Sequence, residues 1–450
     1  MRTIEQLAQA LDAGQTSSRA LVEDSLTRIA DPSGEGARVF IKVHVQQARA
    51  MADAADSLRR VGRSPGRYAG IPIALKDLFD IAGEPTPAGS AVLADAPHAV
   101  ANAPVVARML AAGFIPMGRV NMTEFAFSGL GINPHYGTPL SPWDRASGRI
   151  PGGSSSGTAV AIADEMAAAG LGTDTGGSCR IPAAFCGIVG YKPTARRVPI
   201  DGVLPLAPSL DSIGPLAPSV ACCAAIDGIL AGEGPSVPAP VGLKGLRFAV
   251  PENMVLDGMD AAVAAAFDRA LSALSAAGAT VVRISFAAFD EIPAVNAKGG
   301  FAASEAYAWH RTLLASKGAG YDPNIRVRIA RGEGMSAADY LDLLAARKRI
   351  VSGFDASTRD FDCVLMPTVP IVPPLVAELN DQQAYNRINM LILRNTALGN
   401  FLDRCSISVP CHRTGDAPVG LMLTGETMGD ARLFSIAAAV ERCLKIPAMR

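Results

Sequence analysis

The positions of hydrophobic and polar residues follow two different periods along this chain. Apolar residues recur at helical spacing over eight segments, which are 3–12, 18–30, 45–60, 104–112, 158–169, 260–277, 337–360 and 429–443. Short apolar runs predict seven strands, which are 71–75, 114–117, 246–250, 280–284, 363–365, 406–409 and 419–423. Strand and helix patterns alternate throughout, so the sequence predicts an α/β fold in which helices cover a buried sheet.

Composition limits the class of protein. Of the 450 residues, 49% are hydrophobic and 18% are charged, which provides for a large core and excludes a disordered chain. The formal net charge is −1, so we expect no nucleic-acid partner bound through a basic face. The sequence has no secretory signal pattern after Arg2 and no uninterrupted apolar run long enough to span a membrane, so we expect a cytoplasmic protein without membrane contact.

Cysteine and histidine usage points away from metal binding. The eight cysteines include no C-x-x-C pair, and the five histidines are scattered without metal-ligand spacing. We therefore expect reduced thiols, no metal site and no bound metal cofactor. Glycine, by contrast, is abundant, with 44 residues, and it gathers in three segments that also carry reactive side chains.

The first segment, 70–77 (GIPIALKD), places Lys76 at the end of an apolar strand. One interpretation is a lysine whose stem crosses apolar surface while its ammonium reaches water. The other is a lysine held in low dielectric, where its pKa falls and the neutral amine acts as a base.

The second segment, 151–157 (PGGSSSG), precedes the alanine-rich helix and includes Ser154. A flexible turn with a helix-capping serine is one interpretation. A nucleotide-binding loop is disfavoured because the G-x-x-x-x-G-K-[ST] pattern is absent. A nucleophile elbow formally matches G-x-S-x-G, but no strand pattern precedes it.

The third segment, 172–182 (GTDTGGSCRIP), has two glycines before Ser178. Such glycines let successive N–H groups point into one concavity that stabilises an oxyanion, and a serine at its end can attack a carbonyl bound there. The alternative is a glycine-rich turn between strand and helix. No histidine lies near these segments, so the base at hand for a serine nucleophile is Lys76.

Together the three motifs, in this order and spacing, resemble the amidase signature family, and weaker similarity extends over most of the chain. The resemblance implies the amidase signature fold, an α/β/α sandwich around a large mixed β-sheet of about ten strands. It also implies a single amidase domain over 1–450, with a signature core at about 65–215 and a more variable half at about 240–450 that forms the substrate pocket.

The resemblance further implies a Ser–cis-Ser–Lys triad. Ser178 would be the nucleophile, Ser154 the bridging serine after a cis peptide bond, and Lys76 the base, with no cofactor. The oxyanion would bind to backbone N–H groups, and the residues that supply them are Thr175, Gly176, Gly177 and Ser178. Two further implied roles are a substrate contact by Ser128 and a flanking pair that orients the nucleophile, Asp174 and Arg180.

The implied function is hydrolysis of a small-molecule carboxamide through a serine acyl-enzyme. An alternative in the same family is the glutaminase subunit of a tRNA-dependent amidotransferase, which works with a partner. Segment 204–209 (LPLAPS) departs from the Phe-Ala-Ser-Ser-like run of that glutaminase. A third alternative is a catalytically silent binding scaffold, against which the intact Lys76, Ser154 and Ser178 argue. The resemblance also allows a homodimer.

The acyl pocket is harder to assign from the sequence. Several polar residues of the variable half could line it, but we expect them on the surface or in loops; they are Glu305, His310, Arg326, Arg328 and Asp403.

Overall fold

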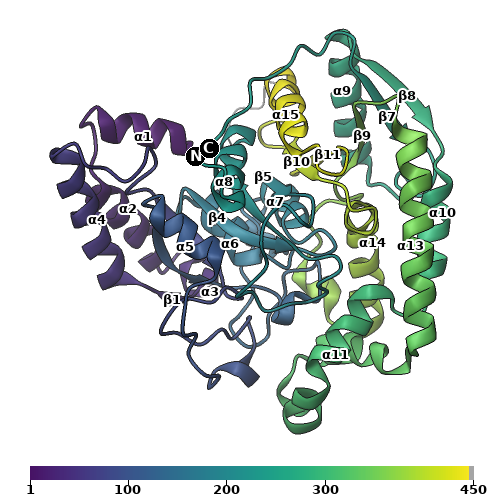
Figure 1. The fold of residues 1–450 in the computed structure, drawn as a ribbon, viewed down its shortest axis with the longest axis horizontal. Helices are drawn as coiled ribbons and strands as arrows, with labels where there is room; N and C mark the ends of the chain where they lie inside the picture. The colour runs from purple at the N-terminus through teal and green to yellow at the C-terminus, as the bar shows by residue number, and fades with distance from the viewer. Residues whose placement is uncertain (445–450) are drawn as a thin grey trace.

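A mixed sheet of 11 strands runs through both halves of the chain in the computed structural model, which describes residues 1–444 (Figure 1). Its strands, in the order of the chain, are β1 (Phe40–Val43), β2 (Pro72–Lys76), β3 (Ile115–Val120), β4 (Ala169–Asp174), β5 (Val189–Lys192), β6 (Ser212–Ala217), β7 (Arg247–Pro251), β8 (Thr280–Ile284), β9 (Cys363–Pro367), β10 (Ser406–Pro410) and β11 (Gly420–Thr424). Their order in the sheet is β1-β3-β2-β4-β6-β5-β10-β11-β9-β7-β8. The β3-β2-β4 and β9-β7-β8 neighbours are parallel, and the others are antiparallel.

Helices connect the strands. Within the described residues the α-helices are α1 (Ile4–Asp12), α2 (Ser18–Ala30), α3 (Gly36–Val39), α4 (Val45–Arg60), α5 (Pro104–Ala111), α6 (Ser156–Ala163), α7 (Arg180–Cys186), α8 (Val220–Ala231), α9 (Ala261–Ala276), α10 (Ala287–Val295), α11 (Gly300–Lys317), α12 (Pro323–Ala330), α13 (Ala337–Thr358), α14 (Gln382–Phe401) and α15 (Asp430–Leu444). The 3-10 turns are η1 (Ala91–Leu93), η2 (Glu124–Ala126), η3 (Arg145–Ser147), η4 (Gly318–Gly320), η5 (Arg331–Gly334) and η6 (Val376–Leu379).

Both faces of the sheet are covered, because successive side chains of a strand point to opposite faces. In β6, Ile213 and Ala217 pack in a core that includes α1, α5, α8 and α15, whereas Leu216 packs in a core with α2 and α6. The same alternation in β9 separates Leu365 from Met366. The predicted α/β/α sandwich is therefore confirmed, with 11 strands where about ten were expected.

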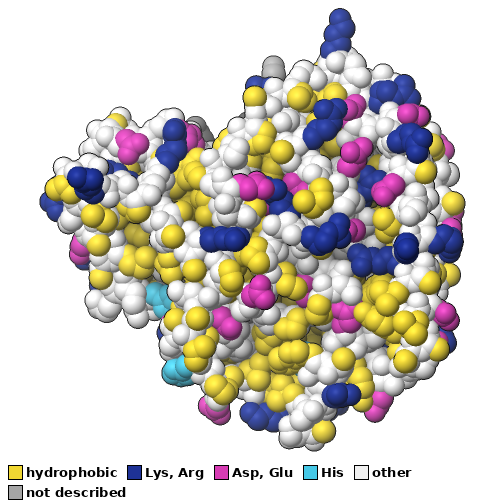
Figure 2. Space-filling model, viewed as in Figure 1, with side chains coloured by type: hydrophobic (Ala, Val, Ile, Leu, Met, Phe, Trp, Pro, Cys, Tyr) yellow, Lys and Arg dark blue, Asp and Glu magenta, His cyan; other side chains and the backbone are white. Residues whose placement is uncertain are grey.

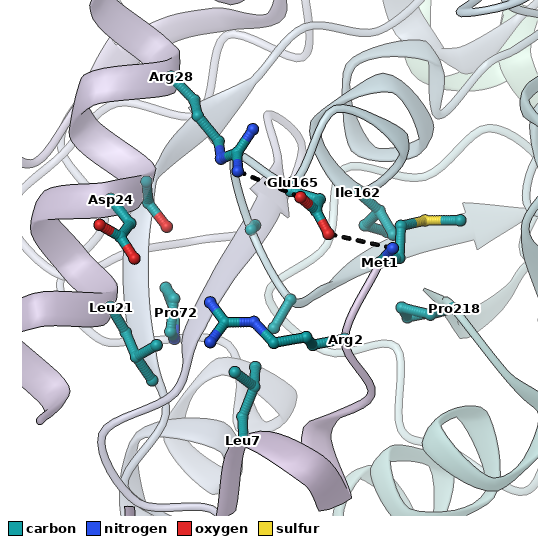
Figure 3. A pocket seen from close by; sticks show the side chains of 13 residues that line it. Met1, Arg2, Leu7, Leu21, Asp24, Arg28, Pro72, Ile162, Glu165 and Pro218 are labelled. Atoms are coloured by element: carbon teal, nitrogen blue, oxygen red, sulfur yellow. Dashed lines mark ion pairs between the residues drawn. The ribbon is translucent and has the colours of Figure 1, made fainter. Parts of the chain in front are cut away.

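The predicted β-α-β unit at 246–284 is confirmed as β7, α9 and β8, with β7 and β8 parallel neighbours. The alanine-rich helix predicted over 158–169 is wrong at its end, because α6 stops at Ala163 and β4 begins at Ala169. Glu165 takes a left-handed backbone conformation with φ 56°, and its carboxylate pairs with the α-amino group of Met1 and with Arg28. Figure 3 shows these two ion pairs at a small pocket that α1, α2 and α6 line.

Three strands in the middle of the sheet escaped the sequence pattern: β4 (AGLGTD), β5 (VGYK) and β6 (SIGPLA). Their glycines give little strand signal, since glycine is depleted in strands. The structure explains why glycine stands at these positions, because the backbone of a neighbouring segment comes too close to leave room for a side chain. A Cβ atom on Gly214 would lie 1.9 Å from the carbonyl oxygen of Tyr191, and one on Gly190 would lie 2.3 Å from that of Cys179.

The described part of the chain can be checked for membrane-spanning helices, disulfides, metal-binding clusters and surface charge. None of its helices combines the length and apolar character that a transmembrane segment needs. The eight cysteines are free thiols, and residues 1–444 contain no cluster of three or more His, Cys, Asp or Glu side chains suited to a metal ion. Basic and acidic side chains are interspersed on the face shown in Figure 2.

We expect Gly214→Ala to destabilise the fold by about 1–3 kcal/mol, because the added methyl group has to displace backbone in the centre of the sheet. Gly353→Ala in α13 is the matched control. Its Cβ meets no atom within 4 Å, and alanine favours a helix over glycine by about 1 kcal/mol. Thermal unfolding of the variants measures both effects, and a midpoint for Gly214→Ala at or above that of the wild type would contradict the packing argument.

Candidate active site

The proposed site lies where β2 and β4 end. These strands are parallel neighbours, with Leu75 opposite Leu171, so the carboxyl ends of both strands meet at the same edge of the sheet. Lys76 is the last residue of β2, and Thr173 and Asp174 are the last residues of β4. The sheet register therefore brings together two of the three sequence motifs that the chain separates by about a hundred residues.

Lys76 is enclosed rather than extended to water. Its side chain is 1% exposed, and its Nζ donates hydrogen bonds of 2.8 Å each to Ser154 Oγ and Thr173 Oγ1. Burial lowers the pKa of Lys76 to about 7, against the opposing influence of nearby acidic groups that include Asp174 and Asp211. The solvent-reaching interpretation of this lysine is therefore excluded, and its amine is neutral in a large fraction of molecules at neutral pH.

Ser154 lies in a loop that the structure holds from several sides. The Gly153–Ser154 peptide bond is cis, as the resemblance implies, and Ser154 is fully buried. The Ser154 carbonyl accepts a hydrogen bond from Thr123 N–H at 3.1 Å. A Cβ on Gly153 would lie 2.6 Å from the backbone nitrogen of Gly131, so only glycine fits at that position. Ser155 takes the N-cap position of α6, but its side chain makes no capping bond.

Asp174 organises the third glycine segment. Its carboxylate accepts hydrogen bonds from the N–H groups of Gly177 (2.8 Å) and Cys179 (3.1 Å), from Arg180 Nε and Nη2 (3.0 and 2.8 Å), and from Asn400 Nδ2 (3.0 Å). Although burial opposes ionisation, the Arg180 guanidinium lowers the pKa of Asp174 to about 2. The two side chains expected to flank the nucleophile are thus a fully buried ion pair.

The turn at 175–178 presents backbone N–H groups. Gly177 has φ 134°, a conformation that favours glycine, and its N–H is engaged by Asp174. Among the described residues no protein acceptor binds the N–H groups of Thr175, Gly176 or Ser178. The turn is also held from α14, since Thr396 Oγ1 donates to the Gly176 carbonyl at 2.6 Å. Three of the four expected N–H donors are therefore free for a ligand.

Two further contacts join this turn to the rest of the site. The Ser178 carbonyl accepts a hydrogen bond from Ser155 N–H at 3.2 Å, which links the second and third glycine segments. The Thr175 hydroxyl donates to the Asp211 carboxylate, which also accepts the N–H groups of Leu206 (3.0 Å) and Ala207 (3.1 Å).

Above the turn lies a mainly apolar cavity of about 460 Å³. Four of the sequence-predicted residues line it: Ser128, Thr175, Gly176 and Ser178. Ser178 is only 3% exposed, so a ligand reaches it through the cavity. The Ser128 hydroxyl donates to Asn389 Oδ1 at 2.9 Å, which ties the segment after η2 to α14.

The sequence interpretation missed several residues of the site, among them Thr173, Asp211, Thr396 and Asn400. Thr173 had a usable signal, because it follows Gly172 in the third motif. Thr396 and Asn400 lie on α14, more than 200 residues after the third motif, and no sequence signal links them to it. The expectation that the polar residues of the variable half lie on the surface or in loops was wrong for two of them. His310 is fully buried on α11 with its Nδ1 2.9 Å from the Tyr321 hydroxyl, and Arg328 on α12 lines the cavity.

Known amidases and a component of an amidotransferase are similar to this chain. The Amidase family model matches residues 20–434. A 2-amino-5-chloromuconic acid deaminase from Comamonas testosteroni is 39% identical over 88% of this chain and 86% of its own length. A component of the glutamyl-tRNA(Gln) amidotransferase from Chloroflexus aggregans is 34% identical over 98% of this chain and 96% of its own. A crystallised amidase superposes with a TM-score of 0.88 and 31% identity, over 98% of this chain and 99% of the other.

The family model spans nearly the whole chain, and both relatives exceed 30% identity over most of it. The crystallised amidase shares the fold over 98% of this chain. The chain therefore belongs to the amidase family and is a hydrolase that acts on amide bonds.

Proposed function

We propose that this protein cleaves the carboxamide C–N bond of a small molecule through an acyl-enzyme on Ser178, with Ser154 and Lys76 as proton relay. The observation that supports this most is the buried Lys76 amine, 2.8 Å from Ser154 Oγ and with a pKa of about 7. A base serves best when its pKa lies near the working pH. The relative named a deaminase of 2-amino-5-chloromuconic acid supports a substrate of low molecular weight.

The relay begins with neutral Lys76. Its amine accepts the hydroxyl proton of Ser154 across the 2.8 Å contact, while Ser154 accepts the proton of Ser178. Ser178 Oγ then forms a bond to the amide carbon, and the carbonyl oxygen becomes an oxyanion. Thr173 Oγ1, also 2.8 Å from Nζ, holds the amine in place as its charge changes.

The oxyanion is stabilised by backbone N–H groups. We assign it to those of Thr175, Gly176 and Ser178, because Asp174 engages the N–H of Gly177. In this assignment Gly177 contributes the turn, and the Asp174–Arg180 pair keeps the turn rigid. Such preorganised donors stabilise the transition state because they need no reorientation when charge develops.

Collapse of the tetrahedral intermediate breaks the C–N bond. The proton held by Lys76 returns through Ser154 to the departing nitrogen, which leaves as ammonia or an amine. Water then attacks the Ser178 ester by the same relay, and the free carboxylic acid and the resting hydroxyls are restored. The relay and the oxyanion contacts use only side chains and backbone of this chain.

A second candidate is the glutaminase component of a tRNA-dependent amidotransferase. It is favoured by relatives named as components of glutamyl-tRNA(Gln) amidotransferase, one of which aligns with 98% of the chain. Ammonia release from glutamine that rises only when partner proteins and tRNA are added would favour this candidate. Hydrolysis of small carboxamides by the isolated chain would favour the first.

Replacement of Ser178 tests the nucleophile. We expect Ser178→Ala to abolish ammonia release from every accepted carboxamide, because the other hydroxyl at the turn, that of Thr175, is engaged by the Asp211 carboxylate. A fluorophosphonate probe should label the wild type at Ser178 and leave the variant unlabelled, as mass spectrometry of the labelled peptide would show. Near-wild-type hydrolysis by Ser178→Ala would refute the assignment, and a wild-type protein that resists labelling would favour a silent scaffold.

The pH dependence tests the base. Burial lowers the pKa of Lys76 to about 7, so the neutral, basic form accumulates as pH rises, and kcat/KM should rise through pH 7 and level off above it. Lys76→Ala should lower kcat/KM by about 10²–10⁴ at every neutral pH and remove this limb. A profile from pH 5 to about 9 on one carboxamide measures both, and a limb that survives in Lys76→Ala belongs to another group.

Thr173→Val tests the second contact of the amine. Loss of the hydroxyl oxygen removes an acceptor that favours charged Lys76, so its pKa should fall further and the rising limb should move to lower pH. Thr158→Val is a suitable control, because its buried hydroxyl donates to the Leu171 carbonyl and makes no contact with Lys76. An unmoved limb in Thr173→Val would show that the hydroxyl does not influence the amine.

A further inference from the structure

The charged side chains that line the cavity are of one sign. Among the described residues they are three arginines, Arg328, Arg331 and Arg394, and no Asp, Glu, Lys or His lines the cavity with them. The rest of the lining is mainly apolar and includes Leu206, Leu210, Ile292, Phe301 and Phe401. The cavity therefore combines an apolar body with positive charge, and its described lining offers no carboxylate to a cation.

Two of these arginines are poorly suited to bind a ligand in the cavity, because one is hydrogen-bonded to the protein and the other is exposed. Arg394 donates through Nη1 to the Asp257 carbonyl (2.8 Å) and through Nη2 to the Val255 carbonyl (2.9 Å), while its Nε donates to Asn395 (3.0 Å). Arg331 is exposed in η5. The remaining arginine, Arg328, is half-buried beside the cavity.

Arg328 is held in place by Phe127, the residue before Ser128. Its Nε donates to the Phe127 carbonyl at 2.8 Å, and its guanidinium carbon lies 5.0 Å from the centre of the Phe127 ring. Helix α12, which carries it, is fixed at its start by a 2.7 Å hydrogen bond from Asp322 N–H to the buried Glu124 carboxylate. The segment that carries Ser128 thus also positions this guanidinium.

The two terminal nitrogens of Arg328 have no acceptor in the described part of the protein. Within residues 1–444 neither Nη1 nor Nη2 makes a hydrogen bond, and no carboxylate lies within ion-pair distance. Burial lowers the pKa of this guanidinium, because a cation held partly out of water without a counter-ion is less stable than in solvent. A carboxylate accepts two parallel N–H bonds from such a planar fork.

We propose that the acyl part of the substrate has an apolar body that ends in a carboxylate, bound by Arg328, and carries no ammonium group. The proposal rests on the proposed function, because it places the scissile carboxamide at Ser178 in the same cavity. Glutamine and other amino-acid amides are disfavoured, since their ammonium would enter an apolar cavity that offers no acidic side chain. The substrate class is then the monoamide of a dicarboxylic acid.

Matched pairs of amides test the proposal. Succinamic, adipamic and suberamic acids are each compared with the neutral amide of equal length, butanamide, hexanamide and octanamide, and with glutamine. The best half-amide should exceed its neutral partner and glutamine by at least about tenfold in kcat/KM, the worth of one charge-assisted hydrogen bond. Wild-type enzyme that prefers none of the half-amides, or that prefers glutamine, would overturn the proposal.

Variants on α12 then separate charge recognition from a structural role. Arg328→Met should lower the ratio of kcat/KM for the best half-amide over its neutral partner by at least about tenfold, and Arg328→Lys should lower it less. Arg326→Met, an exposed arginine on the same helix, is the matched control and should leave the ratio unchanged. Equal losses for both amides in Arg328→Met would overturn the proposal, because they would indicate a structural role.

Binding to an inactive enzyme keeps this proposal distinct from the proposed function. Calorimetry on Ser178→Ala should show the best half-amide binding at least about tenfold more tightly than in Ser178→Ala/Arg328→Met. Such binding without turnover by the wild type would refute the hydrolytic function and leave the carboxylate site standing. Turnover of charged and neutral amides at equal rates would do the opposite.

Discussion

The enclosure of a lysine amine between two hydroxyls in the apolar interior is the constraint around which the site is arranged. Lys76 is stable there only because it is neutral in a large fraction of molecules and because Ser154 and Thr173 accept its hydrogen bonds. Those partners arrive from different places: one from a glycine loop before α6, the other from the adjacent parallel strand. The low dielectric lowers the pKa of the amine, so the amine is able to accept a proton at neutral pH.

A second buried group complements this amine. The Asp174–Arg180 pair is fully buried, and its carboxylate accepts hydrogen bonds from backbone N–H groups on one side and from Asn400 of α14 on the other. Buried ion pairs contribute little net stability when compared with apolar residues, but their geometry is specific. Here that geometry determines where the turn at 175–178 lies, and it ties the signature half of the chain to the helix that lines the cavity.

The sequence predicted the α/β class and placed the candidate site residues in short motifs, but it did not predict the strands at the centre of the sheet. Lys76, Ser154 and Ser178 stand in glycine-rich motifs that are local in sequence, and the structure brings Lys76 and Ser154 into contact. The central strands β4, β5 and β6 could not be predicted by strand propensity, because their glycines are required by neighbouring backbone rather than by any local preference. Arg328 and His310 were misplaced for a related reason: α11 and α12 pack against the segment at 124–128, and no pattern within either helix records that contact.

By itself the sequence determined the α/β class, the family resemblance and the candidate nucleophile, bridge and base, since each of these depends on residue type and short-range spacing. Only the tertiary structure decided that the Lys76 amine is shut away from water, which N–H groups of the turn are free, and which arginine of the cavity has terminal nitrogens without an acceptor among the described residues. Burial, hydrogen-bond partners and the charge of a cavity depend on segments hundreds of residues apart, and they exist only once the sheet has brought those segments together.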